Sequence, residues 1–294
     1  MNNYVLSCCS TSDLTFYEYK ELDIEHISFH YFMDDVEHTD DNFTSITSDA
    51  FYNAMSNGVK TRTSQVNVEE FTTYFEKFLL KGKDILHVTL SSGISGVINS
   101  ATIAATLLKE KYPSRKIIIV DSLCGSGGYA FLMYKLSKLK KEGHTIEELN
   151  EYAINNRLRI IHLLFPTDLR YFFNGGRVKK AVGFISNILH FCPIIESNKE
   201  GKMVLKKKAI GKKHALNDLY DLFKETVDNG VNYNDLLIIA HAHMKEDAET
   251  LKEKILSEFI NLKDKIKIME IGTTMGSHCG PGTMMLNYFG KVRE

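Results

Sequence analysis

The sequence predicts an α/β protein of two domains, the first a helix-covered parallel sheet and the second an α+β arrangement. Its 294 residues suggest two domains or one large domain. Apolar runs at 85–90 and 117–120 are each followed by a small polar stretch and then a helical pattern, as in parallel sheets. The second half lacks this regular alternation. We therefore expect domains at residues 1–157 and 158–294.

The first domain is predicted to repeat strand-then-helix units. The run at 117–120 is continuously apolar, which is typical of a strand buried in a parallel sheet. Residues 60–65 are expected to form a short polar segment. The expected elements are strands at 4–6 and 27–32, a helix from about residue 50 capped by Ser48 and Asp49, a helix at 68–80, a strand at 85–90, a helix at 97–111 and a strand at 117–120.

The second domain is predicted to mix a hairpin with strands and helices. Two apolar runs flank Asn198–Gly201, which has the composition of a hairpin turn. This mixture indicates an α+β domain. Its other expected elements are a strand at 162–165, a helix and turn at 168–177, a strand at 236–241, a helix at 246–260 and a strand at 266–271.

Charge and composition argue against several classes of protein. The formal net charge is −1, so we expect no nucleic-acid partner. The five cysteines are scattered without zinc spacing, and we predict neither disulfides nor a metal site. The glycine-rich run at 125–128 matches no nucleotide-binding motif; we interpret it as close helix packing and expect no cofactor. With no signal-peptide pattern and no apolar run near about 18 residues, we expect a cytoplasmic protein.

The loop Ser91–Gly96 is the most informative stretch of the chain. It follows the expected strand at 85–90 and precedes the expected helix at 97–111. Such a loop offers free backbone N–H groups, the positive end of a helix dipole and several hydroxyls. The sequence therefore predicts a site for a carboxylate or a phosphate.

Thr63 and Ser95 are the candidate hydroxyls. Serine and threonine are common helix caps, so a structural role is the alternative for each. Both lie beside other small polar groups near predicted strands, whose loops gather at one edge of a parallel sheet. Ser95 does not lie in a G-x-S-x-G elbow, and no nucleophilic triad is predicted.

One histidine and two arginines are further candidates. His278 lies in the glycine-rich stretch 272–282, where the backbone can approach a ligand closely. A histidine satisfied by turn carbonyls is the alternative. Arg170 and Arg177 each offer a planar fork for an oxyanion, but a salt bridge to an acid such as Asp168 is equally consistent.

Five sequence elements, in the right order and spanning nearly the whole chain, resemble the DegV family, whose characterised members bind fatty acids. Each element is weak alone, and the ordered set is specific. The elements are Thr63-Ser64-Gln65 for T-S-Q-P, Ser91–Ala101 for S-S-x-L-S-G-T-x-x-S-A, Val120-Asp121-Ser122 for V-x-D-S, Asp168–Val178 for D-L-x-x-L-x-x-G-G-R-I, and Ile271–Gly282 for I-G-x-x-x-G-x-H-x-G-P-G.

This resemblance implies a DegV-like two-domain α/β fold that holds one long acyl chain between its domains. It implies that Thr63 and Ser95 hold the carboxylate. It further implies that His278 and Arg170 orient or neutralise that group, and it assigns no catalytic residue. The predicted ligand-binding set is Thr63, Ser64, Ser95, Gly96, Arg170, Thr274 and His278.

The resemblance also implies partners. Family members in Gram-positive bacteria act as the acyl-binding subunit of a fatty acid kinase and present the carboxylate to a separate ATP-binding subunit. We expect such a kinase partner, a long-chain fatty acid and transient contact with a membrane surface. Two alternatives stay open: a stand-alone hydrolase or phosphotransferase on a small acyl or phosphorylated substrate, and a lipid carrier or sensor without a kinase.

The chain departs from the family pattern at two positions. Cys9 stands where an Asp is usual, and Val66 stands where a Pro is usual. We expect these changes to affect phosphorylation more than binding. An acyl tail would be stabilised by ~0.8 kcal/mol per buried methylene. Candidate tail-contacting residues, with core packing as the alternative, are Phe184, Ile185, Ile188, Leu189 and Ile194.

Overall fold

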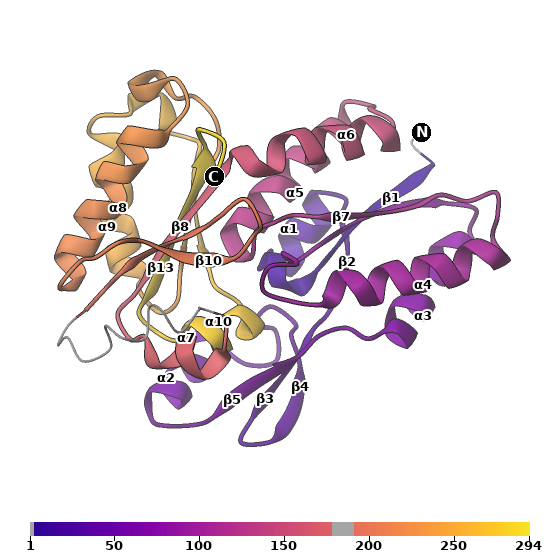
Figure 1. The fold of residues 1–294 in the computed structure, drawn as a ribbon, viewed down its shortest axis with the longest axis horizontal. Helices are drawn as coiled ribbons and strands as arrows, with labels where there is room; N and C mark the ends of the chain where they lie inside the picture. Colours follow the sequence, from indigo (N-terminus) through magenta and orange to yellow (C-terminus); the bar gives the residue numbers. More distant parts are fainter. Residues whose placement is uncertain (1–2, 178–190) are drawn as a thin grey trace.

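Three β-sheets organise the part of the chain that the computed structural model describes, residues 3–177 and 191–294 (Figure 1). The first is four-stranded and wholly parallel, in the order β2-β1-β6-β7. Helices cover both of its faces, which confirms the expected α/β class. The strands are β1 (Tyr4–Cys9), β2 (Glu25–Ile27), β6 (Asp84–Thr89) and β7 (Ile117–Asp121), and the helices are α1 (Phe16–Glu21), α3 (Val68–Leu79), α4 (Val97–Lys111), α5 (Ser126–Lys141) and α6 (Ile146–Asn156).

Local sequence explains where several of these helices begin. Thr15, Asn67 and Thr145 each accept a hydrogen bond from a backbone N–H three residues on, where a glutamate returns the contact. These capping boxes satisfy donors that the first helical turn leaves free. The apolar strand β7 lies at the sheet edge and is only half-buried, although the sequence predicted burial on both faces.

A small antiparallel sheet, in the order β4-β3-β5, follows the first two strands of the chain. The expected strand at 27–32 is divided between β2 and β3. The expected polar segment at 60–65 contains β5. Its polar side chains gave no strand signal, and its pairing with β3 defines it as a strand. The strands are β3 (His30–Met33), β4 (Val36–Thr39) and β5 (Thr61–Ser64). Helix α2 (Ser48–Ser56) lies between β4 and β5 in the sequence.

The third sheet has six strands in the order β10-β9-β8-β13-β11-β12. The central strand β13 was missed by the sequence prediction, which ended its strands at residue 271. The predicted hairpin is confirmed as β9 and β10. Helices α8 and α9 cover one face and α5 the other. The elements are β8 (Ile160–Pro166), β9 (Ile194–Ser197), β10 (Met203–Lys207), β11 (Leu237–His241), β12 (Ile266–Glu270), β13 (Thr283–Phe289), α8 (Lys212–Thr226) and α9 (Lys245–Leu256).

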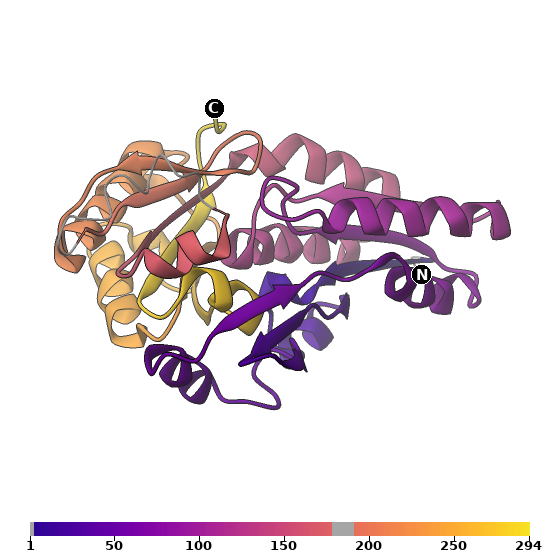
Figure 2. The same ribbon diagram turned by 60° about the horizontal axis from the view of Figure 1, so that its bottom comes forward.

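Short helices complete the described chain. The 3-10 turn η2 contains the expected domain boundary near residue 157, and the division into domains stays a prediction. Helix α10 lies between α7 and the small sheet, so a segment near the end of the chain packs against its first third (Figure 2). These helices are α7 (Arg170–Gly175), α10 (Thr273–Cys279), η1 (Ser10–Ser12), η2 (Arg157–Arg159), η4 (Gly230–Asn232) and η5 (Ile260–Leu262).

Helix α5 contacts both large sheets, and its glycine-rich start explains how. A Cβ on Gly127 would lie 2.5 Å from Asn287 Nδ2, and one on Gly128 would lie 2.7 Å from His162 Nδ1. The absence of side chains there lets the first turn of α5 approach β8 and β13 directly. The interpretation of residues 125–128 as close helix packing is confirmed.

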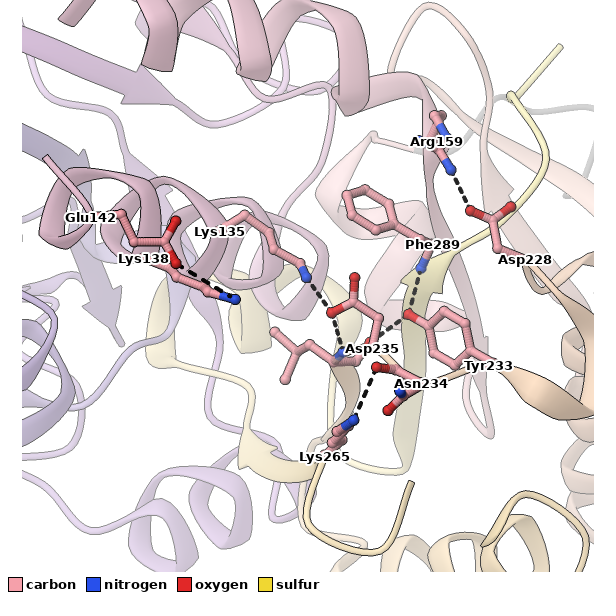
Figure 3. Close-up of polar contacts among 11 residues, drawn as sticks. Lys135, Lys138, Glu142, Arg159, Asp228, Tyr233, Asn234, Asp235, Lys265 and Phe289 are labelled. Atoms are coloured by element: carbon pink, nitrogen blue, oxygen red, sulfur yellow. Dashed lines mark hydrogen bonds and ion pairs between the residues drawn. The ribbon is translucent and has the colours of Figure 1, made fainter. Parts of the chain in front are cut away.

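Further along α5, a polar cluster fixes the helix to the six-stranded sheet (Figure 3). Lys135 forms an ion pair with Asp235, and its ammonium lies 5.2 Å from the ring centroid of Phe289. Tyr233 Oη accepts a hydrogen bond from the backbone N–H of Phe289 at 3.0 Å and donates one to the carbonyl of Leu236 at 2.7 Å. We call these five residues the Lys135 cluster.

Candidate functional site

A cavity of about 400 Å³ lies between the three sheets, lined by residues of β5, β8, β10, β13, α7, α10 and the loop after β6. This volume falls in the range of small-molecule sites, about 300–1,000 Å³. The predominance of apolar side chains suits an apolar ligand. Its apolar wall contains Phe29, Leu90, Ile94, Leu164, Phe172, Met203, Met275, Cys279 and Met285.

Polar residues mark the mouth of this cavity. Thr63 on β5 and His278 on α10 lie 215 residues apart in sequence, and Thr63 Oγ1 is 2.7 Å from His278 Nε2. Both residues, together with Arg177, also line a second hollow that opens outward. The mouth is therefore the place where a polar head group can face solvent while its tail lies in the cavity.

His278 is held neutral at this mouth. Burial, and then the nearby charge of Arg177, lower its pKa to about 4. Its Nδ1 is buried and has no hydrogen-bond partner among the described residues. A Cβ on Gly175 would lie 2.6 Å from that nitrogen, so this glycine allows α7 to pack against the ring. A neutral imidazole carries one N–H, and when Nε2 donates it to Thr63 Oγ1 the threonine hydroxyl is free to donate its own hydrogen to a ligand.

The loop before α4 supplies the second hydroxyl. Ser95 Oγ donates to Gln65 Oε1 at 3.2 Å and accepts from the backbone N–H of Val97 at 3.2 Å. Gly96, which also lines the cavity, directly precedes the 15-residue helix α4. The positive end of this helix dipole favours an anion near Ser95 and Gly96.

The second half of the chain holds this loop in position. Ser91 Oγ donates to the carbonyl of Gly201, at the β9–β10 turn, at 2.8 Å. A Cβ on Gly93 would lie 2.4 Å from the carbonyl carbon of Gly201. Because the turn and the loop touch backbone to backbone, the stretch predicted to bind an anion is fixed from both halves of the chain.

The predicted ligand-binding residues separate into two groups in the structure. Thr63, Ser95, Gly96, Thr274 and His278 all line the cavity. Ser64 is exposed, because successive residues of a strand point to opposite faces. Arg170 lines the outer hollow and not the apolar cavity; its side chain is 83 % exposed and its Nη2 is 2.6 Å from Asp168 Oδ2.

Three polar residues that line the cavity were not in the predicted set. Arg177 lines both the cavity and the outer hollow, and its Nε donates to the carbonyl of Ile94 at 3.4 Å. Gln65 follows Thr63 by two residues, a spacing that places both on one face of an extended segment. His162 lies within an apolar strand, where its isolation among aliphatic residues was the available signal.

Neither sequence departure lines the described cavity, and of the tail candidates only Ile194 lies within the described residues. Cys9 is buried in the core, where its Sγ is 3.6 Å from His87 Nε2, and it does not line the described cavity. Val66 is fully buried. Ile194 is buried in β9, while Phe184, Ile185, Ile188 and Leu189 lie outside the described residues.

The outer hollow, of about 520 Å³, is basic. Lys60, Arg62, Arg170 and Arg177 line it, and no carboxylate does so among the described residues. Arg62 and Arg170 are each paired with an aspartate, Asp35 or Asp168, that lies outside the lining. The hollow therefore presents cations directly outside the mouth that Thr63 and His278 form.

Residues 3–177 and 191–294 present neither a cluster of metal-ligating side chains nor a membrane-spanning helix. No group of three or more His, Cys, Asp or Glu side chains there could hold a metal ion. None of the helices in these residues combines the length and the apolar character that a membrane crossing requires.

Known proteins share both the sequence pattern and the fold of this chain. The model of the family described as uncharacterised proteins of the DegV family matches residues 9–291. A DegV domain-containing protein of Clostridium perfringens is 34 % identical over 295 residues, covering 100 % of both chains. A DegV lipid-binding protein of Thermotoga maritima superposes with a TM-score of 0.85 at 23 % identity, covering 100 % of both chains. A stearic-acid-binding protein of Eubacterium ventriosum superposes with a TM-score of 0.88 at 21 % identity, covering 98 % of both chains. The chain belongs to the DegV family.

Proposed function

We propose that this protein binds one long-chain fatty acid, with the acyl tail in the apolar cavity and the carboxylate at the mouth. The observation that supports this proposal most directly is a largely apolar cavity that ends in hydroxyl, imidazole and guanidinium groups. Each buried methylene contributes ~0.8 kcal/mol, so the tail supplies most of the affinity. The relatives that bind stearic acid or other lipids share this fold.

In this proposal the head group is held by Thr63, Ser95, His278 and Arg177. Thr63 donates its hydroxyl hydrogen to the carboxylate, and neutral His278 donates to Thr63 Oγ1 and so orients it. Ser95 donates to the carboxylate when its hydroxyl turns away from Gln65 Oε1. Arg177 supplies the positive charge that the sequence assigned to Arg170, because Arg177 reaches the cavity and Arg170 is engaged with Asp168. Charged hydrogen bonds of this kind fix the orientation of an otherwise uniform chain.

Fatty-acid binding is tested on delipidated protein with octadecanoic acid, by calorimetry. We expect Thr63→Val, which keeps the side-chain shape, to weaken binding about tenfold through the lost hydrogen bond. Ser64→Ala is the matched control, since Ser64 is the next residue of β5 and is exposed. Mass spectrometry of the denatured, freshly purified protein should release a fatty acid. Neither a released lipid nor measurable binding would overturn the proposal.

We further propose that the bound carboxylate is presented to an ATP-binding kinase subunit. The basic hollow directly outside the mouth supports this step, because it can attract the triphosphate of the partner's nucleotide. A carboxylate oxygen would attack the γ-phosphorus of ATP, the β–γ bridging bond would break, and acyl phosphate and ADP would form. Thr63 and His278 line both spaces, so the head group meets the hollow without leaving the cavity.

The presentation step is tested with the cognate kinase subunit, ATP and the fatty-acid-loaded protein. We expect acyl phosphate in the complete mixture alone. Arg170→Ala should slow its formation while octadecanoic acid still binds, because Arg170 lies outside the cavity. Binding without acyl-phosphate formation would favour the carrier or sensor alternative.

The geometry argues against a stand-alone hydrolase, although Thr63 and His278 form a hydroxyl–imidazole pair. A general base of this type is oriented by a third group on its other ring nitrogen. His278 Nδ1 has no such partner in the described part of the chain. The lowered pKa of His278, about 4, also makes it a weak base at neutral pH.

A further inference from the structure

The inner wall of the cavity carries a polar atom that the proposed head-group site does not use. His162, on β8, lines the cavity and is 1 % exposed. It does not line the outer hollow at the mouth. Its Nε2 has no hydrogen-bond partner among the described residues. A buried nitrogen without a hydrogen-bond partner carries a desolvation cost. A ligand that forms a hydrogen bond with this nitrogen removes that cost and so binds more tightly.

The other ring nitrogen of His162 is fixed by its neighbour in the sheet. His162 Nδ1 lies 2.5 Å from Asn287 Oδ1, and the two residues are paired in the β8–β13 register. Asn287 Nδ2 donates to the carbonyl of Ile238 at 3.3 Å, which leaves its Oδ1 facing the ring as an acceptor. Nδ1 must then carry the hydrogen.

This tautomer makes Nε2 an acceptor. Burial lowers the pKa of His162 to about 4, so the ring is neutral at pH 7. A neutral imidazole that is protonated at Nδ1 has a lone pair at Nε2 and can only accept there. The group that satisfies it must be a donor.

The position of His162 places this acceptor beside the tail of a bound acyl chain. Leu164 is two residues away on the same face of β8, and Leu164 and its register partner Met285 both line the cavity. On the other side of His162, the first turn of α5 closes the space at Gly128. The acceptor therefore lies where the aliphatic wall ends against α5.

We propose that this protein selects hydroxylated long-chain fatty acids, with a hydroxyl on the acyl chain donating to His162 Nε2. The inference rests on the proposed fatty-acid site and deepens it by naming the ligand class. The donor must be an O–H, because an unsubstituted or unsaturated chain carries no hydrogen that a nitrogen lone pair accepts strongly.

Positional isomers provide the sharpest test. Octadecanoic acid and its 2-, 6-, 9-, 10-, 12- and 17-hydroxy isomers are titrated into delipidated protein. The hydroxy isomers share one composition, so differences among them report where the hydroxyl lies. We expect one isomer, or two adjacent ones, to bind at least as tightly as octadecanoic acid and about tenfold tighter than the other isomers. Equal binding of all isomers, or tighter binding of octadecanoic acid than of every isomer, overturns the inference.

Variants assign the preference to His162. In His162→Leu the preference among isomers should disappear while octadecanoic acid still binds. Leu163→Met, at the next residue of the same strand, should retain the preference because Leu163 does not line the cavity and the change removes no polar atom. An unchanged isomer preference in a folded His162→Leu protein overturns the assignment.

A spectroscopic readout covers the case in which His162→Leu does not fold. In the unaltered protein with ¹⁵N-labelled histidine, the preferred isomer should shift the Nε2 resonance of His162 and octadecanoic acid should not. No shift with the preferred isomer counts against the inference. If neither octadecanoic acid nor any isomer binds, the fatty-acid proposal itself fails, which is a distinct result.

Discussion

Helix α5 meets the six-stranded sheet in two places that use their polar groups in opposite ways. At its first turn it covers His162 and Asn287, where one ring nitrogen is left without a partner beside the cavity. In the Lys135 cluster, about two turns on, the ammonium is paired with Asp235, and Tyr233 both accepts and donates (Figure 3). The unmatched nitrogen of His162 lines the cavity and is open to a ligand, whereas the matched groups of the Lys135 cluster fix α5 to the six-stranded sheet.

The largest difference in unfolding free energy between the two regions is expected when the buried ring of Phe289 is truncated. Phe289 packs edge-on against Phe131 with ring centroids 4.8 Å apart. Phe289→Ala should lower the free energy of unfolding by about 3–5 kcal/mol, as measured by urea denaturation. The affinity of the folded protein for octadecanoic acid should not change.

Phe172→Ala is the matched truncation at the cavity. Phe172 is also buried, but it already faces open space on one side. Its loss should cost less stability than that of Phe289 and should weaken fatty-acid binding. Equal destabilisation by the two variants, with binding unaffected in both, would remove the distinction between the regions.

A second effect is the response of stability to acid, to which the buried histidines, His278 among them, should contribute. The pKa of His278 is about 4 in the folded protein, below the ordinary value of 6.5. Between pH 6.5 and 4 the unfolded chain takes up a proton that the folded chain does not. This contribution to stability is complete above pH 6.5 and is lost as the pH falls, by up to about 1.4 kcal/mol per pH unit.

His278→Gln should therefore flatten the decline of unfolding free energy between pH 6.5 and 4 by the share of one histidine. The remaining histidine slope comes from residues whose pKa values burial also lowers: His162 and His241 to about 4, His87 to about 3, and His26. His214→Gln, an exposed position at the start of α8, is the control and should leave the slope unchanged. Urea titrations at pH 7, 6, 5 and 4.5 measure the pH dependence of the free energy of unfolding. An unaltered slope in His278→Gln would contradict a neutral, buried ring.

The sequence predicts most of the fold because burial follows apolar runs. Strands β6 and β11 and helix α4 lie within a residue of their expected bounds, since continuous or periodic apolar patterns define them. β5 and α10 could not be predicted in this way. β5 is polar throughout, and α10 contains glycine and serine and is placed by its packing between α7 and β5. Tertiary contacts outweigh local propensity in both.

The candidate site shows the same division. Thr63, Ser95 and His278 could be chosen because hydroxyls and a histidine stood beside strands and glycines, and all three line the cavity. The choice between Arg170 and Arg177 could not be made, because both belong to one motif and the orientation of α7 decides which reaches the cavity. His162 was hidden by the apolar strand around it, which also makes its unpartnered nitrogen significant.

The smallest expected effect on the free energy of unfolding comes from removing a charge from α5. It tests whether the ion pair itself contributes to stability. The side chain of Lys135 is 16 % exposed and is paired with Asp235, whereas Lys138, one turn later, is 73 % exposed and lies 3.8 Å from Glu142 (Figure 3). Lys135→Met should cost about 1 kcal/mol, because it leaves Asp235 without its cation beside the Phe289 ring.

Lys138→Met is the matched control, since it removes the same charge from the same helix where water screens it. Its cost should be within about 0.5 kcal/mol of zero. Both variants should bind octadecanoic acid as the unaltered protein does, because neither lysine lines the cavity. If the two substitutions cost the same, solvent exposure rather than pairing governs this contact. The contact between α5 and the sheet would then depend on the aromatic rings of Phe289 and Tyr233 and not on the charge of Lys135.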